Sequence, residues 1–173
     1  MKKALFSILI VIGILLVATI FIAFRSSKSP LTTSTPGVPS ASTGEAIEVS
    51  FRELAHGSQS TVSRRANYII MSPTELSALW KMIDAGGEAP TVDFSANEVV
   101  AVFAGDKPTA GYDIEVIKVE DAGTRLVNVV LTKPGGSCLL AEVQTNPYQI
   151  IEVPKTALTL THEDQTTTTS CLQ

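Results

Sequence analysis

Groups that perform catalysis or bind metal ions are scarce in this chain. Its 173 residues include two histidines and two cysteines, and neither His56 nor His162 lies in a metal-binding spacing such as H-x-x-x-H. Cys138 and Cys171 are too far apart in sequence to form a zinc-binding pair, and no G-x-S-x-G motif surrounds Ser137. We therefore expect no metal, no cofactor and no enzymatic activity. A hydrolase that uses Cys138 or Ser137 with His162 is the alternative that this inventory favours least.

Positive charge is also in short supply. The chain has 13 Lys and Arg against 17 Asp and Glu, a net charge of −4. Without the three positive residues Lys2, Lys3 and Arg25, the net charge becomes −7. An acidic protein gains no counterion release from phosphates, so we expect no nucleic-acid partner. Neutral, basic or peptide-like partners are expected instead.

One long apolar run stands near the N-terminus. Residues 4–24 contain no charged residue, and as a helix they would span ~31 Å, about the thickness of a bilayer's hydrocarbon core. A cleaved secretory signal would have a shorter apolar region that ends at small residues such as A-x-A. Neither feature is present, so the sequence predicts a retained single-pass transmembrane anchor.

The orientation of this anchor rests on three hints, because Lys2 and Lys3 nearly balance Arg25 and Lys28 across it. The flank before the anchor is too short to be a domain. The Ser/Thr/Pro-rich segment after it is typical of proteins outside the cell. The two cysteines could form a disulfide, which persists in oxidising compartments. We therefore expect a cytoplasmic N-terminus and an extracytoplasmic folded domain.

The remainder divides into a tether, one domain and a tail. Residues 26–44 cannot bury enough apolar surface to offset the entropy of ordering, which predicts a disordered tether. Residues 45–164 have the size of one domain, and residues 165–173 are expected to be a flexible tail. Cys138 and Cys171 either pair, closing a loop of about 33 residues, or stay as two thiols.

Most of the domain has the apolar pattern of β-strands. Candidate strands lie at residues 48–54, 67–71, 99–104, 114–119, 126–131, 148–153 and 157–161. The unbroken apolar run at 99–104 indicates a central strand covered on both faces. The alternating pattern of 114–119 changes phase between Val116 and Ile117, which indicates a β-bulge or burial on both sides.

One helix is expected after Ser72, because Ser72 and Glu75 fit a capping box with Pro73 at the first helical position. One apolar stripe follows, made of Leu76, Leu79, Trp80 and Ile83. Trp80 is then a core anchor, with a ligand platform as the alternative. Together these patterns predict an α+β fold: a predominantly antiparallel β domain, as a curved sheet or partly closed barrel, with one amphipathic helix.

Two segments of this domain resemble a known bacterial family. The segment from Val92 to Tyr112, which contains NEVVAVFAGDKPTAGY, and the segment 144–155, QTNPYQIIEVPK, are similar in order and spacing to the C-terminal domain of PrcB-type protease complex subunits. The resemblance covers about residues 47–162. It implies an exported accessory subunit of a surface protease complex that is not itself a protease. Ala110 and Gln149 depart from the family, which commonly has glycine and histidine there.

The turn at residues 108–112 is the candidate contact surface, because a Pro/Gly turn at a sheet end can present a hydroxyl and an aromatic ring to a partner. The candidate contacts are Pro108, Thr109, Gly111 and Tyr112, with Pro147 and Tyr148 as a neighbouring edge. The same turn resembles the N-P-T-T-G-Y loop of chagasin-like protease inhibitors, so an inhibitor is the alternative function. In a third interpretation, Tyr112 is core and the turn is merely structural. The expected partner is another exported protein, such as a protease.

Overall fold

The computed structural model describes residues 45–170 of the chain. Their elements are β1 (Ile47–Glu48), β2 (Arg52–Gly57), β3 (Ala66–Ile70), α2 (Pro73–Trp80), β4 (Asn97–Phe103), β5 (Asp113–Asp121), β6 (Arg125–Pro134), β7 (Tyr148–Pro154) and β8 (Leu160–Thr169). No helix within this range is long and apolar enough to cross a membrane. The anchor expected at 4–24 and the tether expected at 26–44 lie outside the described residues, so both stay predictions.

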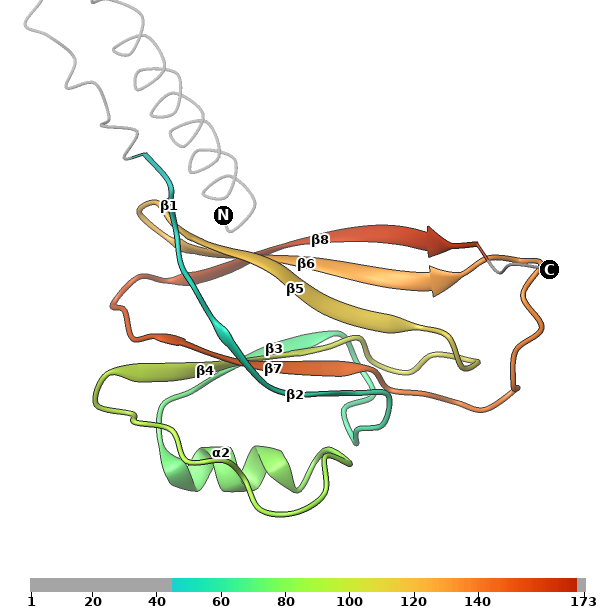
Figure 1. The fold of residues 1–173 in the computed structure, drawn as a ribbon, viewed down its shortest axis with the longest axis horizontal. Helices are drawn as coiled ribbons and strands as arrows, with labels where there is room; N and C mark the ends of the chain where they lie inside the picture. The colour runs from blue at the N-terminus through green and yellow to red at the C-terminus, as the bar shows by residue number, and fades with distance from the viewer. Residues whose placement is uncertain (1–44, 171–173) are drawn as a thin grey trace, which may run out of the picture. The chain divides into compact units, whose positions relative to one another are not determined.

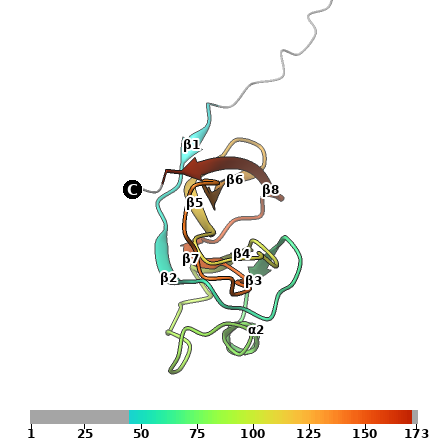
Figure 2. The ribbon, with the colours of Figure 1, turned by 90° about the vertical axis from the view of Figure 1, so that its right-hand side faces the viewer.

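The strands form two stacked sheets with α2 as a third layer. Sheet A has the order β1-β5-β6-β8, and sheet B has the order β2-β7-β4-β3. All neighbouring strands are antiparallel except β6 and β8, which are parallel. Figure 1 shows sheet A above sheet B and α2 below it, and Figure 2 shows the same layers from one end. The predicted antiparallel β domain with one helix is confirmed. The curved single sheet or partly closed barrel is wrong, because two open sheets are present.

Two hydrophobic cores lie on opposite faces of sheet B. Alternate residues of β4, namely Val99, Ala101 and Phe103, pack in the same cluster as Leu76 and Leu79 of α2. The residues between them belong to a second cluster with apolar residues of β5, β6 and β7. β4 is therefore covered on both faces, as its uninterrupted apolar run predicts.

The start of α2 follows its sequence signals. Ser72 is the N-cap, and its Oγ accepts a hydrogen bond from Glu75 N at 3.3 Å. The Glu75 carboxylate accepts from Met71 N at 2.8 Å, and this bond is the main reason that the pKa of Glu75 is lowered. The apolar stripe then points Leu76 and Leu79 into the core. The predicted helix is confirmed, but it ends at Trp80, so Ile83, the last residue of the predicted stripe, lies beyond it.

The two ends of the domain depart from the expected pattern. The predicted strand at 48–54 is split: β1 pairs in sheet A and β2 pairs in sheet B, so the chain crosses between the layers at residues 49–51. The flexible tail expected from Gln165 is wrong as far as Thr169, because these residues pair with β6 as part of β8. Nearly all side chains of β8 are exposed. The strand is held by its backbone pairing, which leaves no apolar signal in the sequence.

Candidate functional site

Two loops lie at one end of the sandwich, called here the loop end: residues 104–112 join β4 to β5, and residues 135–147 join β6 to β7. The connection from β2 to β3 meets both loops there, since Asp106 N donates to Ser63 O and Asn146 N donates to Ser58 O. Lys107 N donates to Thr145 O at 2.8 Å, and Thr145 N donates to Lys107 O at 3.0 Å. Thr145 Oγ1 also donates to Thr109 O at 3.0 Å. The two loops are therefore joined through their backbones, at the right-hand end of Figure 1.

Two glycines permit the path of the first loop. Gly105 has φ +75°, and a Cβ there would lie 2.8 Å from Arg64 C and from Arg65 N. Gly111 has φ +87°, and a Cβ there would lie 3.2 Å from Leu140 Cδ2. Both positions combine a left-handed backbone with a close neighbour, so glycine is required at each.

The first loop presents part of the predicted contact surface. Pro108 and Gly111 are exposed, while Thr109 and Tyr112 are half-buried. The loop therefore offers a small surface with a partly accessible aromatic ring. Whether a partner binds there stays a prediction.

Pro147 and Tyr148 belong to the interior. Both are buried, and Tyr148 is 1% exposed. The Tyr148 ring lies 6.2 Å from that of Phe103, and its hydroxyl donates to Asp84 Oδ1 at 3.2 Å. Burial, reinforced by the Asp84 carboxylate, raises the pKa of Tyr148 to about 12. The expectation that these two residues form an exposed contact edge is therefore wrong.

The second loop adds apolar surface that sequence reasoning missed. Leu139 is fully exposed and Val143 is 48% exposed. They flank Ala141, whose carbonyl accepts a hydrogen bond from Ala110 N at 3.1 Å. Leu139, Ala141 and Val143 recur at every second position, as in a strand, but the structure forms no strand there, so the pattern does not reveal that these side chains are exposed. Exposed apolar side chains gathered on one surface mark interaction sites.

A polar cluster lies beside the loop end, where β5 begins. His56 Nε2 lies 2.7 Å from Asp113 Oδ1, which links β2 of sheet B to β5 of sheet A. Glu53 Oε2 lies 3.7 Å from His56 Nδ1. The Asp113 hydrogen bond raises the pKa of His56 against the opposing effect of burial, and the same bond lowers the pKa of Asp113. This group, called the His56 cluster, consists of His56, Asp113 and Glu53.

Gln149 completes the polar surroundings of this cluster. It is buried, its Oε1 accepts from Val116 N at 2.6 Å, and its Nε2 donates to Glu53. The register of β5 shifts between Val116 and Lys118, which confirms the predicted irregularity as a β-bulge. Bulges disrupt regular ladder pairing. Gln149 therefore supplies an acceptor at the bulge, a structural role for the residue that departs from the family pattern.

The structure separates the residues that were considered for catalysis. Ser137 and Cys138 lie in the second loop, whereas His162 pairs with Val127 near the start of β8. The second loop begins after Pro134, and Pro134 lies opposite Thr169 in the ladder. His162 is seven residues before Thr169 along β8, which is ~23 Å at the rise of a strand, so His162 lies far from the loop that contains Ser137 and Cys138. Between residues 45 and 170, no group of three or more His, Cys, Asp or Glu could hold a metal ion.

The predicted disulfide partner, Cys171, lies outside the described residues. The described contact nearest to it in sequence joins Gly135 N to Thr169 O at 2.9 Å. This contact brings the end of β8 to the loop that contains Cys138. The pairing of the two cysteines stays a prediction.

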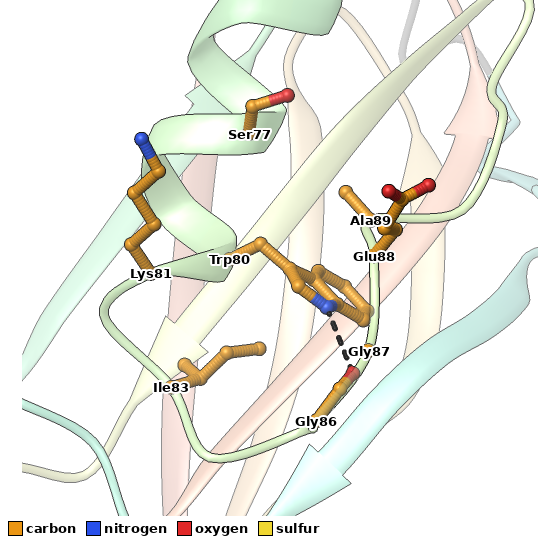
Figure 3. A pocket seen from close by; sticks show the side chains of 8 residues that line it. All are labelled: Ser77, Trp80, Lys81, Ile83, Gly86, Gly87, Glu88 and Ala89. Carbon is orange, nitrogen blue, oxygen red and sulfur yellow. Dashed lines mark hydrogen bonds between the residues drawn. The ribbon is translucent and has the colours of Figure 1, made fainter.

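A separate pocket of about 500 Å³ lies at the C-terminal end of α2 (Figure 3). The Trp80 indole lies across it and donates from Nε1 to Gly86 O at 3.3 Å. Trp80 also packs against the first core, so its predicted role as an anchor is confirmed. Ile83 and Ala89 supply further apolar lining.

Residues 99–154 match the family described as PrcB C-terminal. This match extends from β4 to β7, includes both loops of the loop end, and is narrower than the expected 47–162. No curated protein and no solved structure matches the chain. The likeness of residues 108–112 to chagasin-like inhibitors rests on the loop sequence alone. The predicted resemblance to PrcB C-terminal domains is thus confirmed for the segment that holds both central strands of sheet B and the loop end.

Proposed function

We propose that this protein is a membrane-anchored, extracytoplasmic, non-enzymatic subunit that binds an exported protease or its complex through the loop end. The observation that carries the proposal is the PrcB C-terminal match, because residues 99–154 contain both loops of that end. The family resemblance suggests an accessory subunit of a protease complex. Residues 4–24 would hold it at the membrane.

The geometry of the loop end supports protein binding. Leu139, Val143 and Pro108 are exposed, and exposed apolar side chains gathered on one surface mark interaction sites. The Lys107–Thr145 backbone bridge and the Thr145 side chain hold the two loops together. A surface already ordered before binding loses less conformational entropy when a partner docks.

The expected anchor and tether give the binding module a location. A flexible segment of about 19 residues has an r.m.s. reach of ~25 Å. Confinement within that distance of a membrane raises the effective concentration for partners held at the same surface. Location and binding together then suffice for function without catalytic groups.

The test is a reconstitution. The full chain is captured from native membranes, a co-purifying protease is identified and purified, and its affinity for the purified chain is measured. We expect the double substitution Leu139→Glu and Val143→Glu to weaken binding about tenfold or more, because two charges must be desolvated at the interface. Ile117→Glu is the matched control: Ile117 is exposed on β5 outside the loop end, and its change should alter affinity less than twofold.

Two results would count against the proposal. One is a purified protease that binds the wild type and both variants equally well. The other is stoichiometric inhibition of papain by the full chain that is lost in Tyr112→Ala. The second result would support the chagasin-like alternative.

A further inference from the structure

The two sheets have four edge strands, and three of them carry features that block further pairing within the described part of the chain. β1 has two residues. β2 contains a register shift between Glu53 and Ala55 and charged side chains. β8 carries Glu163 and Asp164. Short strands, bulges and edge charges are the ways in which proteins prevent sheets from pairing edge to edge.

β3 is the fourth edge, and it lacks all three features. Its sequence is ANYII, without a charge, and its register against β4 is unbroken. Tyr68, at its centre, is 41% exposed, and Met71, just beyond its end, is exposed as well. A largely apolar hollow of about 200 Å³ lies between this strand and α2, lined in part by Tyr68, Leu79 and Met82. An edge of this kind can accept another strand.

Opposite charges stand at the two ends of β3. Arg65, directly before the strand, is paired with Asp164 of β8 at 2.7 Å. Arg64, one position earlier, is exposed and makes no ion pair with another described residue. At the other end, the Glu75 carboxylate is held at the strand terminus by its hydrogen bond from Met71 N. An antiparallel neighbour with the same sequence would bring each positive end to a negative end. A parallel neighbour would bring like charges together.

We propose that β3 is a homodimer interface, in which two copies pair antiparallel about Tyr68 and join their B sheets into one eight-stranded sheet. In this register, residue 64 of one copy lies opposite residue 72 of the other. Arg64 then approaches the Glu75 carboxylate of the second copy, and the contact occurs twice because the interface is two-fold symmetric. The uncharged strand supplies backbone pairing, and Tyr68 packs beside its equivalent at the axis.

The position at which the described chain begins, residue 45, agrees with the two-fold symmetry of this dimer. The two-fold axis of an antiparallel edge pair is perpendicular to the sheet, so both copies keep sheet A on the same side. Residue 45 leads into β1, which belongs to sheet A. Residue 45 of both copies therefore lies on one side of the dimer, which agrees with the membrane anchor of the proposed function, on which this point rests.

Disulfide trapping in the full chain tests the register. Tyr68→Cys should form an intermolecular 68–68 disulfide under mild oxidation, because residues directly opposite in an antiparallel pair are within disulfide range. Peptide mapping distinguishes this bond from those of Cys138 and Cys171. Gln165→Cys, on the exposed β8 strand, is the matched control and should not form a 165–165 bond. Absence of the 68–68 bond, or equal trapping at both positions, overturns the proposal.

Charge reversal tests the partner. In sedimentation equilibrium of the detergent-solubilised full chain, Arg64→Glu and Glu75→Arg should each raise the dimer Kd about fivefold, a typical effect for exposed pairs that occur twice. The double variant should return to within twofold of wild type. A helix-capping defect in Glu75→Arg would not be rescued by Arg64→Glu. A monomeric wild type, or failure of the double variant to recover, overturns the proposed dimer. Leu139→Glu is a further control: it changes the loop end and should leave the dimer Kd unchanged, which distinguishes the two surfaces.

Discussion

Two polar clusters connect sheet A to sheet B, one at each end of β5. At one end, Arg125 of β6 is 2% exposed and bonds Glu98 of β4 at 2.9 Å and Asp121 at 2.8 Å. At the other end, His56 of β2 bonds Asp113, whose side chain is 46% exposed. The first group is called the Arg125 cluster. Both clusters bridge the same layers, but only the first contains an ion pair buried on both sides, Arg125 with Glu98.

We call the end of the domain with the Arg125 cluster the fixed end, because its buried charge must stay paired. We call the end with the His56 cluster the adjustable end, because its protonation can change with pH. A buried guanidinium must be paired, because an isolated charge in the interior costs several kcal/mol. The Arg125 cluster meets this need with two carboxylates and the Pro154 carbonyl. The His56 cluster is partly exposed to water and contains a histidine, the side chain whose ordinary pKa lies nearest neutral pH; the Asp113 hydrogen bond raises the pKa of His56 above that value. This cluster lies next to the loop end, where we propose that the partner binds.

The largest expected effect is a loss of stability when the buried ion pair of the fixed end is removed. Arg125→Met leaves Glu98 buried beside an apolar side chain, so we expect the free energy of unfolding to fall by about 3–5 kcal/mol. Urea denaturation measures it. The matched control is Arg52→Met, whose side chain is 61% exposed and pairs with Glu152; that loss should stay below about 1 kcal/mol. Equal losses in the two variants would contradict the contrast between the clusters.

A second test asks whether the loop end has a covalent constraint of its own. If Cys138 pairs with Cys171, Cys171→Ser should lower the free energy of unfolding by ~3.5–4 kcal/mol on the chain-entropy model. Reduction of the wild type with dithiothreitol should give the same loss and leave the variant unaffected. A wild type that is insensitive to reduction, with two titratable thiols in the unfolded chain, would exclude the disulfide.

The features predicted correctly from sequence are those in which local pattern and burial agree. Ser72, Pro73 and Glu75 specify the start of α2, and the apolar run of β4 reflects cores on both of its faces. The strand predicted at 157–161 overlaps only the start of β8. Its continuation to Thr169 was missed because a parallel strand held by backbone bonds to β6 needs no apolar side chains. The division into two sheets was missed for a related reason: pairing partners are long-range, and strand periodicity does not encode them.

The candidate site shows the same limit. The turn at 108–112 could be located from its Pro/Gly chemistry, and its proximity to the second loop is confirmed by the Lys107–Thr145 bridge. The burial of Tyr148 could not be predicted from the sequence, because an aromatic residue at the start of a strand fits either a core position or an exposed edge. His56 and Asp113 are 57 positions apart, so their pairing depends on the stacking of the two sheets.

The smallest expected effect concerns the adjustable end and depends on pH. The pKa of His56 is raised in the folded state, whereas in the unfolded chain it is about 6.5. The folded protein therefore binds the proton more tightly, so the stabilisation is complete below about pH 6.5 and is lost as pH rises through the raised folded value. The pKa of Asp113 is lowered, so its contribution is present above about pH 4 and is lost as pH falls through the depressed folded value.

His56→Gln should abolish the first of these dependences. We expect the variant to lose less than about 1 kcal/mol at pH 6, because Asp113 is partly exposed, and to converge with wild type as pH rises toward 9. Urea titrations from pH 5 to 9 measure the difference, with His162→Gln, an exposed histidine on β8, as the control. A pH-independent loss would mean that His56 acts by packing alone. In that case the loop end would be as fixed as the Arg125 end, and the contrast between the two clusters would be one of burial but not of protonation.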